Sequence, residues 1–262
     1  MSAKKRTPKL GQHFLTNPHY AHMLTESVQV KNGEIILEIG PGRGALTKIL
    51  LETGANVVTI ERDEALASYV ESVFSKDVAN KKLHVVRDDV RDIDPDQLGL
   101  TQGKYVVAAN IPYYITGEII RQFLETNIQP RAIALLVQKE VARRIIAKKE
   151  SILSLSVKVY GTPKIIATVG RGNFSPPPSV DSAIILIDNI SKEKISPIGE
   201  EHFFRVVRAG FASKRKKLLS NLSVSFGKEK VTAAFTKRSL SENTRAEDLA
   251  LETWLDLAKD LH

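Results

Sequence analysis

The segment IILEIGPGRGALTKILLETG, residues 35–54, decides the fold. A short run rich in β-branched residues leads into a glycine-rich turn, and a stretch with helical periodicity follows. Glycine suits such a turn because the chain must bend sharply and let its backbone approach a ligand at the helix N-terminus. The segment therefore predicts the first strand, turn and helix of an α/β sheet.

The same alternation continues along the chain to about residue 188. Apolar runs at 35–39, 56–61, 82–88, 105–110, 132–137 and 182–187 predict strands, and helical patterns occupy 45–54, 64–74, 119–125 and 140–147. Runs separated by helices imply parallel strands joined by crossovers, which is a doubly wound sheet. Residues 158–169 and 180–187 have no helix between them, so we expect an antiparallel edge pair there.

After Asp188 the strand patterns stop. Helical patterns cover 200–222, 229–238 and 250–261, and the polar linker 189–199 contains the proline and glycine expected of a boundary. We therefore expect two domains. Residues 1–188 form the sheet domain with a basic N-terminal arm, and residues 189–262 form a small, basic helical domain.

The composition excludes several classes of protein. The 262 residues are 42% hydrophobic, contain no cysteine and have no apolar run near the roughly 20 residues that cross a bilayer. We therefore expect no disulfides, no thiol catalysis and no membrane insertion. We expect a cytoplasmic location. The six histidines show no metal-ligand spacing, so no metal site is predicted.

The net charge of +8 is concentrated in two places. Between Phe203 and Arg238, ten Lys or Arg accompany one acidic residue, Glu229. The N-terminal arm adds Lys4, Lys5, Arg6 and Lys9. One such run is often only a solvated surface, but two favour a polyanionic partner such as RNA.

Acidic residues follow the second and third strands. Glu61 lies 21 residues after Gly40 (61 − 40 = 21), where a carboxylate can accept hydrogen bonds from both ribose hydroxyls of an adenosine cofactor. Asp89 is placed to bind the adenine amine, with the adjacent Asp88 as the alternative. The spacing Gly40-x-Gly42-x-x-Ala45 also fits a loose dinucleotide fingerprint, so NAD and S-adenosylmethionine both remain candidates at this point.

The end of the fourth strand, Asn110-Ile111-Pro112-Tyr113, favours S-adenosylmethionine. The exocyclic nitrogen of adenine is a poor nucleophile, because its lone pair is delocalised into the ring. Acceptors at the Asn110 side chain and the Ile111 or Pro112 carbonyl would draw that nitrogen toward tetrahedral geometry and stabilise the charge that develops on it. Tyr113 offers a flat face to a base taken out of its helix, whereas Tyr114 is expected to be ordinary packing.

The segment NIPYYIT (110–116) matches the signature of amino-group methyltransferases, and the whole chain resembles the ribosomal RNA adenine dimethyltransferases of the small-subunit type. The resemblance rests on LGQHFLTN (10–17), EIGPGRGALT (38–47), QKEVARRI (138–145), NFSPPPSVDSAI (173–184), FFRVVRAGFASKRKKLLSNL (203–222) and RAEDL (245–249). It implies a Rossmann-like class I methyltransferase sheet followed by a small helical domain.

The resemblance also implies the site. The implied cofactor-binding residues are His13, Leu15, Gly40, Gly42, Glu61, Asp89 and Asn110, and the implied catalytic residues are Asn110, Pro112, Tyr113 and Phe174. Tyr113 and Phe174 would sandwich the target base, although Phe174 also suits a core position. His13 departs from the family, which usually has asparagine there.

The implied function is S-adenosylmethionine-dependent N6,N6-dimethylation of two adjacent adenosines in a hairpin loop near the 3′ end of 16S rRNA. The implied partner is 16S rRNA within the immature small ribosomal subunit, and a monomer is expected. One alternative is a large-subunit rRNA adenine dimethyltransferase of the macrolide-resistance type. Another is an RNA-binding assembly factor without catalytic activity.

Overall fold

The computed structural model describes residues 13–262, which form two compact units. The first comprises residues 13–142 and Pro163–Ile190, and the second Arg143–Thr162 and Ser191–His262. The basic arm with Lys4, Lys5, Arg6 and Lys9 lies outside the described residues. None of the helices within 13–262 is long and apolar enough to span a membrane.

The division differs from the expected one because residues 143–162 belong with the C-terminal helices. The backbone N–H of Glu150 donates to the Glu247 carbonyl at 2.8 Å, and Lys149 forms an ion pair with the Glu247 carboxylate at 2.7 Å. These contacts join segments that lie about a hundred residues apart in the sequence. The helical unit is therefore built from two pieces of chain.

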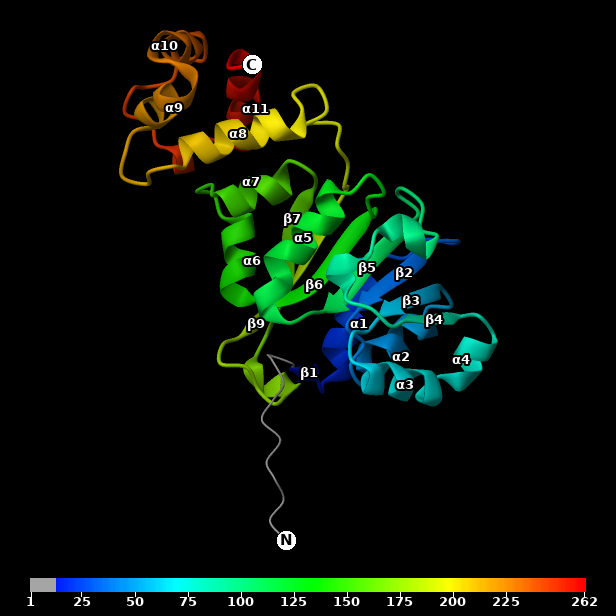
Figure 1. Cartoon of the computed structure of the whole chain (residues 1–262). Coiled ribbons are helices and arrows are strands. Elements are labelled where there is room, and N and C mark those ends of the chain that lie inside the picture. The colour runs from blue at the N-terminus through cyan, green and yellow to red at the C-terminus, as the bar shows by residue number, and fades with distance from the viewer. Residues whose placement is uncertain (1–12) are drawn as a thin grey trace. The chain divides into compact units, whose positions relative to one another are not determined.

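The first unit contains a seven-stranded sheet in the order β4-β3-β2-β5-β6-β9-β7 (Figure 1). The strands are β2 (Ile35–Ile39), β3 (Asn56–Ile60), β4 (Leu83–Val86), β5 (Tyr105–Asn110), β6 (Ala132–Gln138), β7 (Thr162–Val169) and β9 (Ser182–Asp188). The pairs β4-β3, β3-β2, β2-β5 and β5-β6 are parallel, whereas β9 runs antiparallel to β6. The doubly wound sheet is confirmed, and β9 and β7 are neighbours at one edge, as expected.

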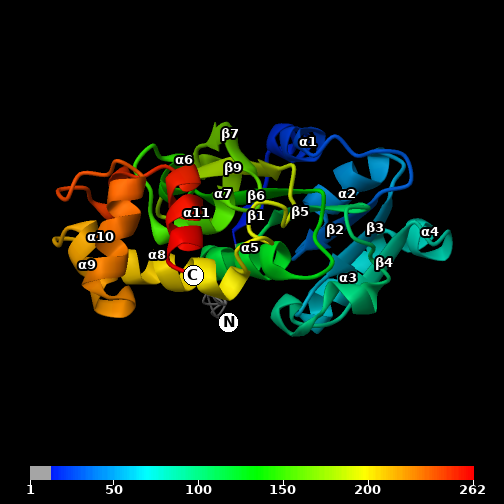
Figure 2. The same ribbon diagram turned by 90° about the horizontal axis from the view of Figure 1, so that it is seen from above.

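Two further strands, β1 (Phe14–Leu15) and β8 (Phe174–Ser175), form a small antiparallel pair of their own. The helices of this unit are α1 (Pro18–Ser27), α2 (Ala45–Glu52), α3 (Glu64–Val73), α4 (Ser75–Ala79), α5 (Thr116–Glu125) and the start of α6 (Lys139–Ile146). Figure 2 shows α1 and α2 on one side of the sheet and α5 on the other. Crossovers in opposite directions from β2 and β5, each right-handed, produce this arrangement.

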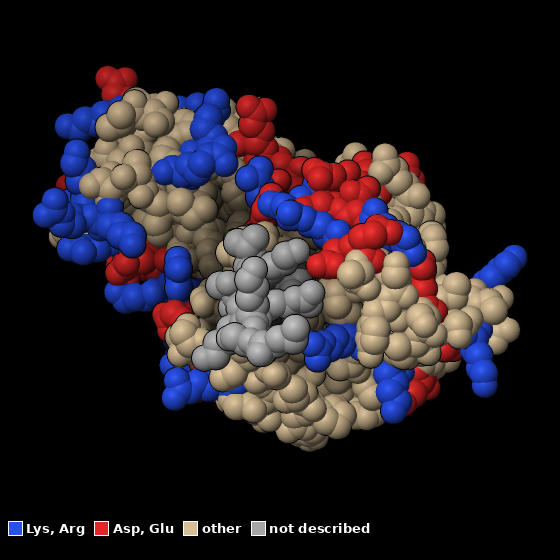
Figure 3. All heavy atoms as spheres, turned by 60° about the horizontal axis from the view of Figure 1, so that its bottom comes forward, with Lys and Arg blue, Asp and Glu red and all other residues tan. Residues whose placement is uncertain are grey.

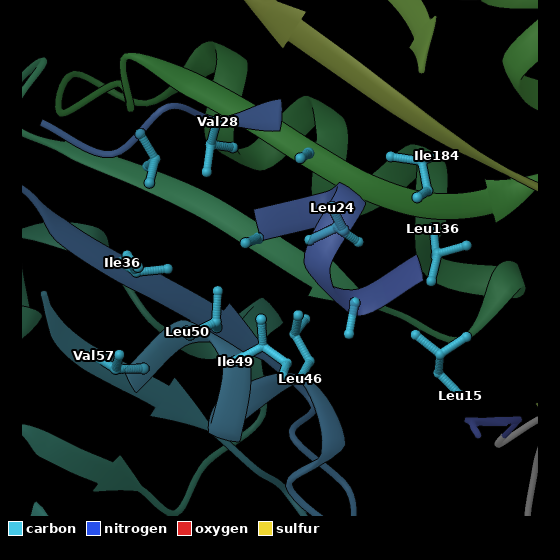
Figure 4. Close-up of a cluster of buried hydrophobic side chains, with 14 of the residues drawn as sticks. Leu15, Leu24, Val28, Ile36, Leu46, Ile49, Leu50, Val57, Leu136 and Ile184 are labelled. Atoms are coloured by element: carbon cyan, nitrogen blue, oxygen red, sulfur yellow. The ribbon is translucent and has the colours of Figure 1, made fainter. Parts of the chain in front are cut away.

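The core follows from the alternation of side chains along buried strands. Ile36 of β2, Leu136 of β6 and Ile184 of β9 point to the same face, where they meet Leu24 of α1 and Leu50 of α2 (Figure 4). All five are essentially inaccessible to solvent. Burial of an aliphatic side chain stabilises the folded state by about 1.5–3 kcal/mol, so this layer stabilises the packing of α1 and α2 on the sheet.

The second unit is helical, as predicted, but with more breaks. It contains the rest of α6 and α7 (Ile152–Lys158), then α8 (Glu200–Gly210), α9 (Leu218–Phe226), α10 (Lys228–Lys237) and α11 (Leu251–Asp260). The single helix expected at 200–222 is wrong, because the chain turns between α8 and α9. The buried Asn221 amide donates to the carbonyls of Gly210 (2.7 Å) and Ser213 (3.0 Å) and so stabilises this turn.

Candidate active site

A cavity of about 570 Å³ opens at the carboxyl ends of the parallel strands. This edge of a doubly wound sheet is the usual place for a ligand, and the volume is typical of small-molecule sites. The sequence-predicted residues that line it are His13, Leu15, Gly40, Gly42, Glu61, Asp89, Asn110, Pro112 and Tyr113. The fold thus brings together every predicted site residue except Phe174.

The glycine turn between β2 and α2 forms the floor of the cavity. Gly42 has φ of +56°, and a Cβ there would lie 2.7 Å from Cε1 of Phe14. Only glycine satisfies both the left-handed backbone and this close approach. The Phe14 ring of β1 therefore packs directly on the turn, and the Arg43 guanidinium lies 5.2 Å from the centre of that ring.

Two buried carboxylates lie beside the turn. Glu61 accepts from the backbone N–H of Asp63 at 2.9 Å and from that of Gly42 at 3.3 Å, and burial raises its pKa while these bonds oppose the shift. Glu38 is 1% exposed, and burial raises its pKa to about 7 although Thr47 donates to Oε2 at 2.7 Å. Its Oε1 has no partner among residues 13–262. Each Glu61 oxygen accepts one backbone bond and keeps capacity for a second, whereas Oε1 of Glu38 is buried.

Asp89 follows β4 at the rim, as predicted, but its carboxylate is already occupied. Arg91 donates to Oδ1 from Nε at 2.9 Å and to Oδ2 from Nη2 at 2.7 Å, and Arg62 reaches Oδ2 at 3.2 Å. The hydrogen bonds from Arg91 lower the pKa of Asp89 to about 2. Asp88, the alternative partner for the adenine amine, also lines the cavity.

Asn110 ends β5 with its side chain held in one orientation. Its Nδ2 donates to the backbone carbonyl of His13 at 3.0 Å. Because the amide nitrogen is bound there, the amide oxygen is left as an acceptor at the cavity. The His13 ring is itself fixed, since Nδ1 donates to the carbonyl of Pro176 at 2.8 Å.

Tyr113 is half-buried and held at both ends. Its hydroxyl lies 2.6 Å from Oγ of Ser182, the fully buried first residue of β9. Its ring stacks on that of His13, with centroids 5.8 Å apart and planes at 29°. Burial raises the pKa of Tyr113, and the bond to Ser182 opposes the shift. The ring is therefore a neutral, rigid face at the cavity.

Two other aromatic residues differ from expectation. Tyr114, expected to be ordinary packing, is 62% exposed and lines the cavity rim. Phe174 is only 4% exposed, belongs to the hydrophobic core cluster and does not line the cavity. Its place in β8, paired with Leu15 of β1, instead brings the following Ser175 and Pro176 to the cavity wall. The base-stacking role of Phe174 stays a prediction.

Part of the basic stretch 203–238 is neutralised within the helical unit. Lys237 and Arg238 pair with Asp260 at 2.6 and 2.7 Å, and Lys230 donates to the His262 carbonyl at 2.7 Å. In contrast, Lys216 and Lys217 are exposed, and neither has a side-chain partner within the described chain. Figure 3 shows many Lys and Arg side chains on this unit. The segment between α8 and α9 thus carries positive charge that is not neutralised within the described residues.

The chemistry of the cavity fits an adenosine-containing sulfonium cofactor. Acceptors for ribose hydroxyls (Glu61) and for an amine (Asp89) lie at neighbouring strand ends, and the glycine turn gives a ligand access to the backbone. No group of three or more His, Cys, Asp or Glu residues suited to a metal ion occurs within residues 13–262. The sheet and this site define a class I S-adenosylmethionine-dependent methyltransferase.

Comparison with known proteins then gives the family. The family model for ribosomal RNA adenine dimethylase matches residues 3–262, and the chain belongs to this family. It is 37% identical over 266 residues to the ribosomal RNA small subunit methyltransferase A of Fusobacterium nucleatum, covering 97% of each protein.

Two solved structures share the fold. A dimethyladenosine transferase from Plasmodium falciparum superimposes with a TM-score of 0.76 at 24% identity, over 94% of this chain and 96% of that one. A 23S rRNA methyltransferase, ErmE, gives a TM-score of 0.74 at 23% identity, over 95% of this chain and 99% of that one. Because the fold is common to both, the fold alone does not select the RNA target.

Sequence reasoning missed several residues of the site. Ser182 holds the Tyr113 hydroxyl from 69 positions away, and Arg91 occupies the Asp89 carboxylate. Glu38 could have been noticed from its position in the glycine-turn segment, as an acidic residue in an otherwise apolar strand. Nothing in the local sequence pattern indicates the Ser182 contact.

Proposed function

We propose that this enzyme dimethylates N6 of two adjacent adenosines in a hairpin loop near the 3′ end of 16S rRNA, acting as a monomer on the immature small ribosomal subunit in the cytoplasm. The observation that carries this proposal is the Asn110 amide, whose nitrogen is bound to the His13 carbonyl inside the cavity. Family membership supports the reaction and the rRNA substrate.

The residues of this chain would hold the cofactor at the glycine turn. Glu61 would accept from its ribose, Asp89 would bind its adenine amine while staying bound to Arg91, and Gly40 and Gly42 would lie against its methionine part. Leu15 of β1 and His13, which comes just before that strand, would cover it. When bound, S-adenosylmethionine supplies an electrophilic methyl group.

Asn110 then prepares the target amine. Its oxygen, oriented because Nδ2 is bound to His13, accepts one amine hydrogen, and the Ile111 or Pro112 carbonyl accepts the other. Both bonds strengthen as positive charge develops on the nitrogen, so they stabilise the transition state more than the ground state. Pro112 has no N–H to compete for these acceptors.

Tyr113 positions the base. A base can be modified at its amine only after it leaves the helical stack, and an aromatic face compensates for the stacking that it loses. The bond to Ser182 and the contact with His13 hold the Tyr113 ring without help from the substrate. Little ordering of this ring is then needed on binding.

The helical unit would bind the RNA backbone. Lys216 and Lys217 are exposed and unpaired within the described chain, in contrast to Lys237 and Arg238. Flexible lysines suit the recognition of phosphates without sequence preference. This grip would orient the rRNA relative to the cavity.

The test is methyl incorporation into 16S rRNA, measured by mass spectrometry in cells with the wild-type protein, without it, and with Asn110→Ala. Dimethyladenosine should be present only with the wild type, and purified Asn110→Ala should lose transfer in a single-turnover assay at saturating cofactor. Retained dimethylation in this variant would falsify the role of Asn110. Primer extension on 16S and 23S rRNA tests the target, since a stop on 23S rRNA alone would assign the enzyme to the large-subunit type.

Loss of the protein with no change in either rRNA would instead support the assembly factor without catalysis. Purified protein that methylates no rRNA could also be misfolded. Binding of labelled S-adenosylmethionine distinguishes the two cases, because a folded protein binds the cofactor whatever RNA is supplied.

A further inference from the structure

Tyr114 is an exposed aromatic side chain at the rim of the catalytic cavity. It is 62% exposed, although the residues on either side of it, Tyr113 and Ile115, are half-buried and buried. Its side chain has no hydrogen bond and no ring contact within residues 13–262. A large part of this aromatic ring is thus accessible to a ligand at the rim of the cavity.

The backbone under Tyr114 is rigid. Residues Tyr113–Ile115 form a 3₁₀ turn in which the Ile115 N–H donates to the Pro112 carbonyl at 3.2 Å, and α5 begins at the next residue. The flanking side chains of Tyr113 and Ile115 are anchored, the first by Ser182 and the second by burial. Tyr114 is thus presented outward from a fixed position, one residue beyond the face assigned to the target base.

The surroundings favour a nucleic acid over an apolar partner. Arg91 also lines the cavity, is held by two bonds to Asp89, and lies near enough to Tyr114 and Glu118 for electrostatic interaction with both. Arg91 and Tyr114 thus line the same cavity, and a basic side chain together with an aromatic ring is a combination that binds unpaired nucleotides. Glu118 and Asp88 are acidic groups that oppose a phosphate at this place.

We propose that Tyr114 stacks on the unpaired nucleobase next to the target adenosine in the RNA strand. This inference rests on the proposed function, because it supplies a second face for the same substrate. When the target base leaves the stack, its neighbour loses a stacking partner, and the Tyr114 ring would replace that partner. Tyr113 would then hold the base that reacts and Tyr114 the base beside it.

The test compares Tyr114→Ala, Tyr114→Leu and Tyr114→Phe with a matched control, Tyr69→Ala. Tyr69 is 49% exposed on α3 and does not line the cavity. Loss of one base–aromatic stack corresponds to about a 5- to 150-fold fall in kcat/KM for RNA. We expect such a fall for the alanine and leucine variants, nearly wild-type activity for the phenylalanine variant and the control, and unchanged binding of S-adenosylmethionine.

A substrate change makes the assignment specific. Two short RNAs carry an abasic nucleotide, one on the 5′ side and the other on the 3′ side of the target adenosine. Wild-type kcat/KM should fall by a similar factor with one of the two, namely the RNA that lacks the base stacked on Tyr114. With Tyr114→Ala, the same RNA should cause no further loss. Independent, multiplying losses, or a Tyr114→Ala enzyme as active as Tyr69→Ala, would overturn this inference. A wild-type protein that methylates neither these RNAs nor immature small ribosomal subunits would instead overturn the proposed function.

Discussion

The bond between Tyr113 and Ser182 is expected to control both stability and catalysis. The two oxygens are 2.6 Å apart, Ser182 is fully buried and Tyr113 is half-buried. Tyr113→Phe leaves the Ser182 hydroxyl buried without a partner, which costs about 1–3 kcal/mol. Ser182→Ala leaves the Tyr113 hydroxyl without its partner. Because this hydroxyl has some access to water, we expect a loss of stability at the lower end of that range, about 1 kcal/mol.

The double variant removes both hydroxyls, so it leaves no unpaired group. Its loss should therefore not exceed that of Tyr113→Phe alone, which gives a coupling energy of at least about 1 kcal/mol in a double-mutant cycle. If the bond also fixes the ring for the target base, kcat/KM for RNA should fall about fivefold in each single variant, the equivalent of 1 kcal/mol.

Urea unfolding and single-turnover methylation of the four proteins measure the two cycles. Ser27→Ala is a matched control, because it removes a local helical bond, to the Leu24 carbonyl, away from the cavity. Additive losses, with a coupling energy below about 0.3 kcal/mol, would refute the reasoning, since residues in direct contact should couple.

Three further predictions concern charge and packing. Glu38→Gln should flatten the pH dependence of unfolding. In the wild type, the pKa of Glu38 is raised from 4.5 to about 7, so the folded state binds a proton that the unfolded state has lost, and the free energy of unfolding should fall by about 3 kcal/mol as pH rises through that window. Urea midpoints at pH 4.5 and 8 measure this fall in both proteins. Gly210→Ala should destabilise the helical unit by about 1–2 kcal/mol in thermal unfolding. The new alanine Cβ would lie 2.3 Å from Cη2 of the fully buried Trp254, and this overpacking outweighs the gain of about 1 kcal/mol in helix propensity. Lys216→Glu with Lys217→Glu should lower the slope of the logarithm of the RNA binding constant against the logarithm of salt concentration by roughly one to two. The same charge change at the exposed Lys48 and Lys76 should leave the slope unchanged. Equal slopes in all three proteins would place the RNA surface elsewhere.

The sequence alone was sufficient for the sheet and for most of the cavity. Strands β2, β3 and β5 were predicted from their apolar runs, and Gly42, Glu61 and Asn110 from their positions at strand ends. These features are local, because strand and helix periodicity depends on residues two to four positions apart. The right-handed crossover then brings the carboxyl ends of parallel strands to one edge, so residues at those ends converge.

Only the tertiary structure decided which side chains are free. Tyr114, expected to pack against the protein, is exposed, and Phe174, for which both base stacking and a core position were considered, is buried. Ser182 reaches Tyr113, and Asp260 neutralises Lys237 and Arg238, across 69 and more than 20 positions of sequence respectively. Exposure and pairing depend on what packs against a residue from distant parts of the chain, and no periodic pattern near that residue carries this information.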